Sequence, residues 1–220
     1  MTTVIFLLFP GVTQLDMTGP AQFLSRLPGA TTIVAARSAE PVATDSGFAL
    51  VPTATFADAP PADVLCVPGG HGVADAVQDQ ATLEFVTRQA AGARWVTSVC
   101  TGAFILGRAG LLEGKRATTH WAYAHLLPLV GAVHEDARVV EDGNTITAGG
   151  VTAGIDFALT LIARVAGEAT AQAIQLALEY DPAPPFRSGT PASAGPERTA
   201  MLKKRVYDKA AARMAAALAQ

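Results

Sequence analysis

One cysteine of this sequence stands where a nucleophile would be expected. Cys100 follows the apolar run Trp95–Val99 and precedes small residues that open a helical pattern, beginning with Thr101 and Gly102. A sharp turn from strand to helix lifts the side chain at the turn above the sheet edge, and the helix N-terminus favours a thiolate over a thiol. We therefore expect an exposed Cys100 with a lowered pKa. The alternative is a small thiol packed beneath the helix.

A second apolar run leads into a pair of glycines. Val64–Pro68 is followed by Gly69 and Gly70, and glycines at the end of a strand allow the backbone to approach a ligand and to aim N–H groups at negative charge. Ligands of open α/β sheets bind at this edge. We therefore expect the loop to face Cys100, with the N–H groups of Gly70 and Thr101 as paired donors. A plain turn is the alternative.

An acidic residue follows the first apolar run. Asp16, in the segment QLDMTGP at 14–20, has two possible roles. As a helix N-cap it would accept N–H bonds from the next turn. As an acid or base beside the thiol, it would have a raised pKa and would carry a proton to or from a reacting carbon.

The other cysteine and the histidines carry weaker signals. Cys66 lies within a strand and is interpreted as an inert core thiol. His71 follows the glycine pair and His120 lies in TTHW at 118–121; both are interpreted first as structural residues. No Cys, His and carboxylate residues have the spacing of a zinc site, so no metal is expected.

These residues need a parallel sheet to bring them together. Short apolar runs bounded by Gly, Pro or polar residues predict buried strands, and these are Val4–Phe9, Thr32–Ala36, Val64–Pro68 and Trp95–Val99. Helical patterns lie between the runs or follow them, at Gln14–Leu27, Ala81–Ala91, Thr101–Ala109 (closed by Gly110), Ile155–Ala166 and Ala169–Tyr180. Repetition of strand and helix predicts right-handed crossovers, with helices on both faces of a mostly parallel sheet.

The remaining segments are expected at the periphery. The turn signal EDGN at 141–144 predicts a hairpin within Arg138–Thr147, and Ala43–Val51 has a similar pattern; both are expected as edge decorations. Residues 181–196, rich in Pro, Gly and Ser, predict a surface arm before an amphipathic helix at Glu197–Leu218. We therefore divide this single-domain chain into an α/β core at 1–180 and an arm and helix packed on it at 181–220.

Composition narrows the function classes. Half of the residues are hydrophobic and 16% are charged, which is enough apolar material for a sheet covered on both faces. The net charge of −3 gives no basic field for nucleic acid. The first apolar run is too short for a signal peptide or a membrane helix, which predicts a cytoplasmic protein that does not bind membranes. In that reducing compartment the two cysteines are expected to be free thiols.

Taken together, the motifs resemble the ThiJ/PfpI superfamily, which is class I glutamine amidotransferase-like. The resemblance runs from about Val4 to about Tyr180 and rests on PGG at 68–70, Cys-Thr-Gly-Ala at 100–103, the early acid, TTHW, and TAGGVTAGID at 147–156. It implies a flavodoxin-like three-layer sandwich. Within the superfamily the chain is most similar to the isonitrile hydratases, which are homodimers that convert isonitriles to N-substituted formamides without a cofactor.

This resemblance implies roles for particular residues. Cys100 would attack the isonitrile carbon to form a thioimidate, with Asp16 as the acid and base, and no metal or cofactor would be required. The substrate is small and largely apolar, so we expect pocket walls from His71, Trp121, Ala148 and Val151.

Two departures from other branches bear on this assignment. Proteases of the superfamily place a histidine where this chain has Thr101, and glyoxalase-like and deglycase members use a glutamate where it has Asp16. Two alternatives stay open: another cysteine-dependent enzyme, such as a glyoxalase, deglycase or amidase, and a ligand-sensing or oxidation-sensing domain. Segment 181–220 is too short for an added helix-turn-helix reader.

Overall fold

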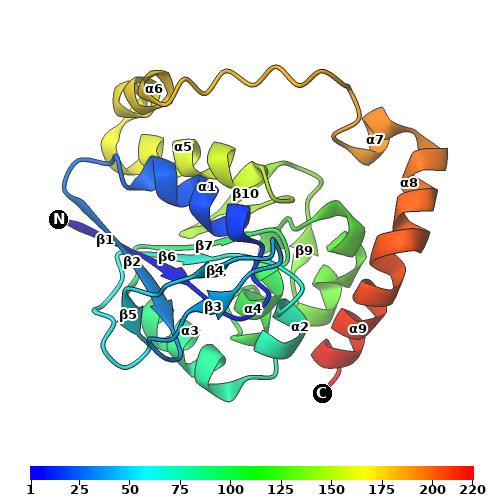
Figure 1. Ribbon diagram of the computed structural model, residues 1–220, viewed down its shortest axis with the longest axis horizontal. Helices are drawn as coiled ribbons and strands as arrows, with labels where there is room; N and C mark the ends of the chain where they lie inside the picture. The colour runs from blue at the N-terminus through cyan, green and yellow to red at the C-terminus, as the bar shows by residue number, and fades with distance from the viewer.

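A seven-stranded sheet forms the middle layer of the computed structural model, which describes residues 1–220 (Figure 1). From one edge to the other the strands are β10 (Val139–Asp142), β11 (Thr145–Ala148), β7 (Trp95–Val99), β6 (Val64–Val67), β1 (Thr2–Leu7), β2 (Ala30–Ala36) and β5 (Ala54–Thr55). All neighbours are parallel except β10 and β11. The predicted mostly parallel three-layer α/β sandwich is confirmed.

The central strands are apolar because both of their faces are covered. Every residue of β6 is buried, and the register places Phe6 of β1 beside Cys66 of β6, which in turn lies beside Thr97 of β7. Such burial on both sides explains why these strands appear in the sequence as continuous apolar runs. The sheet is therefore a rigid support for the loops that follow the carboxyl ends of its strands.

Helices cover the two faces of the sheet. On one face α1 (Gln14–Leu24) packs against α5 (Ala153–Ala166), and α6 (Glu168–Ala177) follows at the side of α5 (Figure 1). The other face carries α2 (Val73–Ala76), α3 (Gln80–Gly92) and α4 (Gly102–Arg108). The helices expected from the sequence are thus present, with ends shifted by a few residues. None of the helices is both long enough and apolar enough to cross a bilayer.

One of the two expected edge decorations has a larger role. β3 (Val42–Ala43) and β4 (Ala49–Leu50) form a separate antiparallel pair, as expected. The prediction for 138–147 was wrong in part, because β11 of this hairpin is fully buried and pairs in parallel with β7. The hairpin therefore extends the central sheet and borders the strand that leads to Cys100.

A segment without predicted helices or strands crosses the carboxyl end of the sheet. The short strands β8 (Arg116–Ala117) and β9 (Val133–His134) pair in parallel, and between them lies a 3₁₀ helix, η1 (Trp121–Val130). His120 caps η1, since its Nδ1 atom accepts a hydrogen bond from Ala122 N–H at 3.3 Å.

The C-terminal segment reaches back to this end of the sheet. An extended arm leads to α7 (Pro191–Ala194), and a continuous helical stretch follows: α8 (Pro196–Leu202), a π-turn η2 (Lys203–Tyr207) and α9 (Asp208–Leu218). α9 packs on α2 and η1, burying Met214 and Leu218, and Arg213 pairs with Asp75 at 2.5 Å. Residues distant in the sequence thereby approach the end of β7.

Candidate active site

Cys100 occupies the sharp turn between β7 and α4 that the sequence predicted. Its φ of 57° lies in the left-handed region, which costs energy for a residue with a Cβ atom. The turn is held by neighbouring segments: Cys100 N–H donates to the carbonyls of Ala148 and Gly149, at 3.0 and 2.9 Å, and Thr119 Oγ1 donates to the Cys100 carbonyl at 2.7 Å. A Cβ atom at Gly102 would lie 2.2 Å from the Val67 carbonyl oxygen, so the helix can start here only with glycine.

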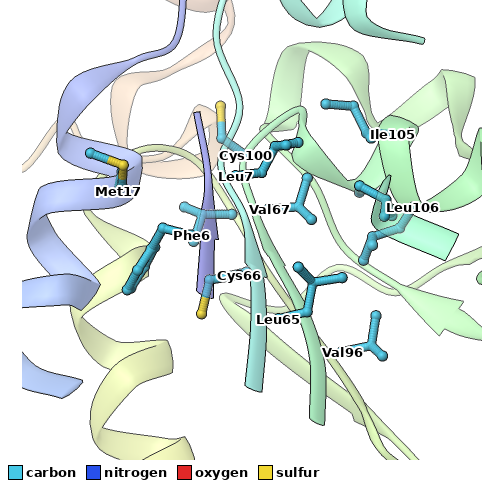
Figure 2. Packing of buried hydrophobic residues seen from close by; sticks show 14 of the residues in the cluster. Phe6, Leu7, Met17, Leu65, Cys66, Val67, Val96, Cys100, Ile105 and Leu106 are labelled. Atoms are coloured by element: carbon cyan, nitrogen blue, oxygen red, sulfur yellow. The ribbon is translucent and has the colours of Figure 1, made fainter. Parts of the chain in front are cut away.

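The expected exposure of the Cys100 side chain is wrong, since only 6% of the residue is accessible. Figure 2 shows its sulfur beyond the ends of the strands, pointing away from the labelled apolar side chains. Cys66 lies deeper, within the packed cluster, and burial raises the pKa of its thiol to about 12. The turn does lift Cys100 above the sheet, but the segments crossing this edge cover it. Cys66 is the inert core thiol that its position predicted.

Asp16 lies beside Cys100 in the first turn of α1. The N-cap of that helix is Thr13, so the capping alternative for Asp16 is wrong. Asp16 is 1% exposed; its Oδ2 accepts the Gly69 N–H at 3.0 Å, and its Oδ1 has no hydrogen-bond partner. Burial raises the pKa of Asp16 to about 7, against the opposing effects of the Gly69 N–H and the Cys100 thiol. The structure thus brings the two predicted catalytic residues together.

The pKa of Cys100 shifts in the direction opposite to our expectation. Burial raises it well above its ordinary value, and the nearby Asp16 charge raises it further. The N–H groups of Thr101 and Val151 lower it, but they do not outweigh desolvation. Protonation of Asp16 removes its charge and leaves an acid that can donate to the sulfur, so a thiolate is favoured only beside a neutral Asp16. The two groups therefore act as a pair that shares a proton.

The backbone donors also differ from the predicted set. The Gly70 N–H donates to Thr101 Oγ1 at 3.0 Å, so Gly70 is not free to bind an oxyanion, and that prediction is wrong. The Thr101 N–H does face the Cys100 sulfur, and the second donor is the Val151 N–H. Val151 was expected only as a wall residue. Its backbone has a φ of 25°, a conformation that the residue type does not indicate and that only the folded chain shows.

A pocket of about 550 Å³ lies beside segment 149–151, whose backbone contacts Cys100, although neither Cys100 nor Asp16 lines it. Trp121 and Val151 line it as expected, together with His120, while Ala148 is fully buried in β11 and does not line it. His71 is exposed, and no hydrogen bond joins its side chain to the site, so its expected contact with substrate is not supported. Burial lowers the pKa of His120 to about 4, which keeps it neutral at physiological pH.

Two tyrosines near the sulfur were missed in the sequence. The charge on Cys100 contributes to the raised pKa values of Tyr123 and Tyr207, after desolvation in each case. Tyr123 comes from η1, and Tyr207 ends the π-turn η2. A tyrosine in a helical pattern gives no sign that it will face a site assembled from other segments.

The DJ-1/PfpI family pattern matches residues 2–164, which include the turn, the glycine pair, Asp16 and the Val151 loop. The chain belongs to the DJ-1/PfpI family. An isonitrile hydratase of Pseudomonas putida is 57% identical over 189 residues, covering 86% of this chain and 83% of the relative.

Solved structures of DJ-1/PfpI proteins agree with this membership. A ThiJ/PfpI family protein from Pseudomonas syringae matches with a TM-score of 0.95 and 41% identity, over 100% of this chain and 91% of that one. A DJ-1 superfamily protein from Salmonella typhimurium, solved as a C103A mutant, matches with a TM-score of 0.71 and 32% identity, over 82% of this chain and 100% of that one.

Burial of the Asp16 carboxyl in this DJ-1/PfpI site has a stability cost that a single variant should reveal. A pKa raised from 3.8 to about 7 means that the folded protein binds this proton more tightly, so stability falls as pH rises from about 4 to 7. The shift corresponds to roughly 4 kcal/mol above pH 7. We expect Asp16→Asn to raise the Tm at pH 8 by about 5 °C or more, with a smaller gain at pH 5.

Thermal unfolding at both pH values, followed by circular dichroism, measures this difference. Asp45→Asn is the matched control, because Asp45 is hydrogen-bonded to Thr13 and is exposed. A Tm gain for Asp16→Asn that is equal at both pH values would show that its carboxyl is not destabilised by ionisation.

Proposed function

We propose that this protein hydrates isonitriles to N-substituted formamides through a thioimidate on Cys100. The observation that carries the proposal is the buried pair of Cys100 and Asp16, in which an acid of raised pKa lies against a thiol at a strand-to-helix turn. The 57% identity to an isonitrile hydratase supports the same activity.

The first step uses the one proton of the pair. The Cys100 thiolate forms a bond to the terminal carbon of the isonitrile, and Asp16 transfers its proton to that same carbon. The carbon–nitrogen triple bond becomes a double bond, which gives a thioimidate and an Asp16 carboxylate. The unpartnered Oδ1 of Asp16 supports this role, because it has no competing hydrogen bond.

The second step consumes water and restores the pair. Asp16 takes a proton from water as the oxygen adds to the thioimidate carbon, passes it to the nitrogen, and then accepts the remaining hydroxyl proton. The carbon–sulfur bond then breaks as the carbonyl forms, so that one water proton ends on nitrogen and the other on Asp16. The Thr101 and Val151 N–H groups, which lower the pKa of Cys100, stabilise the sulfur anion at the start and at the end.

The assembly and location of this enzyme are part of the proposal. We infer a cytoplasmic homodimer that uses no cofactor and does not act on nucleic acid or membranes. Large apolar side chains support a contact with a second copy, because several lie exposed on one monomer, including Leu176 at 82% and Phe186 at 78%.

Wild-type turnover should depend on pH through the pair. The proposed reactive form holds one proton, and at low pH a second proton gives a neutral acid beside a thiol. Since the pKa of Asp16 is about 7, kcat/KM for an alkyl isonitrile should rise with pH and level off above an apparent pKa of about 7 that belongs to the pair.

Formamide production from cyclohexyl isonitrile, followed by chromatography between pH 5 and 9, tests both the activity and its pH dependence. No formamide at any pH, together with alkylation of Cys100 by iodoacetamide, would leave a reactive thiol with a different substrate; aldehydes and amides would be tried next. A rate that falls as pH rises through 7 would contradict the shared proton.

A further inference from the structure

The C-terminal helical stretch is irregular at the point where it passes the active site. η2 is a π-turn, in which one extra residue is inserted into the helix, and such turns are frequent at functional sites. Its first four residues, 203–206, are exposed, whereas Tyr207 is partly buried. The irregular turn thus directs one aromatic side chain inward.

Tyr207 packs into an aromatic cluster, two members of which line the pocket. Its ring centroid lies 4.9 Å from that of His120, 5.3 Å from that of Trp121 and 6.1 Å from that of Tyr123. His120 and Trp121 line the pocket of about 550 Å³. Tyr207 therefore packs against two aromatic side chains of the pocket wall from outside the lining itself, although it comes from the last helical stretch of the chain.

A chain of close contacts joins this cluster to the reacting sulfur. A Cβ atom at Gly150 would lie 2.6 Å from Cδ2 of His120, so the ring rests directly on that loop. The residues on either side of Gly150 touch Cys100: the Gly149 carbonyl accepts its N–H, and the Val151 N–H faces its sulfur. The Tyr207 phenol is also close enough to feel the charge on Cys100.

The Tyr207 hydroxyl has no hydrogen-bond partner in the protein. Of the three tyrosines, only Tyr180 donates a hydrogen bond, to Asp156 at 2.8 Å. Because its pKa is raised, Tyr207 keeps its proton at physiological pH. A neutral phenol without a partner, close enough to the sulfur to sense its charge, can donate to a substrate bound there.

Tyr207 also lies outside the part of the chain that the wider family shares. The family pattern ends at residue 164. The Drosophila DJ-1beta structure covers 82% of this chain with a TM-score of 0.71, whereas the Pseudomonas syringae structure covers all of it with a TM-score of 0.95. A residue from the C-terminal segment, beyond the end of the family pattern, can therefore distinguish substrates among family members that share the same cysteine.

We propose that Tyr207 determines which substrates react at Cys100: its ring supports the aromatic wall formed by His120 and Trp121, and its hydroxyl donates a hydrogen bond to the nitrogen of the bound substrate. This role of Tyr207, as a residue that contacts the substrate, rests on the proposed isonitrile hydration.

Two substitutions separate the hydroxyl from the ring. Tyr207→Phe should lower kcat/KM for cyclohexyl isonitrile about tenfold, while the rate of Cys100 alkylation by iodoacetamide stays within about twofold of wild type. Tyr207→Ala should shift the ratio of kcat/KM for a naphthyl over a methyl isonitrile about tenfold toward the larger substrate. Val206→Ala, in the same π-turn but exposed, is the matched control and should match wild type in both measurements.

Either of two results would overturn the proposal: wild-type kcat/KM in Tyr207→Phe, or a wild-type size ratio in a folded Tyr207→Ala. If wild type turns over no isonitrile, the proposed hydration fails, and the position of Tyr207 is tested by alkylation. Tyr207→Ala should then raise the rate of Cys100 alkylation by N-naphthyl iodoacetamide about tenfold, relative to the rate of alkylation by iodoacetamide. An unchanged ratio would remove Tyr207 from the site.

Discussion

Cys100→Ala should abolish formamide formation, with a loss of at least about 1,000-fold in kcat. The proposed reaction passes through a carbon–sulfur bond, and no other thiol is near the pocket, since Cys66 lies within the packed core. Chromatographic measurement of formamide from cyclohexyl isonitrile gives the loss. A covalent adduct on the wild-type protein, found by mass spectrometry after rapid acid quenching, should be absent from the variant.

Cys66→Ala is the matched control for Cys100→Ala. It removes a sulfur that is equally shielded from water and should cost about 1 to 2 kcal/mol of stability, because it leaves a small cavity in the core. Its turnover should nevertheless stay near that of wild type. If Cys100→Ala kept more than about a tenth of wild-type turnover, the thioimidate mechanism would be ruled out.

Asp16→Asn should lower kcat by about 100-fold or more, which is the range for losing a general acid and base. The amide occupies the same place and can still accept the Gly69 N–H, but it cannot give a proton to the isonitrile carbon. The fall in rate below about pH 7, which is the acid limb of the pH profile, should be absent from the residual activity of the variant, because the group that titrates there is gone. Steady-state kinetics between pH 5 and 9 measures both effects.

Thiol alkylation distinguishes this proton-transfer role from simple activation of the sulfur. The Asp16 charge raises the pKa of Cys100, so at pH 8 the variant should react with iodoacetamide at least as fast as wild type. If Asp16→Asn loses formamide turnover but its Cys100 still reacts with iodoacetamide, the role of Asp16 is proton transfer. Turnover within tenfold of wild type would show that another group supplies the proton.

Asp45→Asn is the control for charge near Asp16. The Asp45 charge contributes to the raised pKa of Asp16, so its removal should move the acid limb of the rate profile to lower pH with little change in the plateau. The amide oxygen can still accept the Thr13 hydroxyl. A plateau reduced as strongly as in Asp16→Asn would indicate a general disturbance of α1.

The elements around Cys100 were predictable because they depend on local patterns. The strand Trp95–Val99 has the bounds that the apolar run indicated, and the helix after Cys100 ends before Gly110, whose φ is 75°. β11 was misplaced because its sequence, TITA, contains two threonines. Alternation of this kind resembles a half-exposed edge strand, and only the packing of α5 and the pairing with β7 show that it is buried.

The sequence alone determined the candidate nucleophile, its turn and the candidate acid, because residue type and strand-to-helix order are local properties. The tertiary structure decided the electrostatics and the walls of the site. Asp16 meets Gly69, 53 residues away, and Tyr207 meets His120 across most of the C-terminal half. Cys100 is buried instead of exposed, and its pKa is raised instead of lowered, because segments distant in the sequence cover it. Desolvation depends on every segment that covers a group, and those segments come together only when the chain folds.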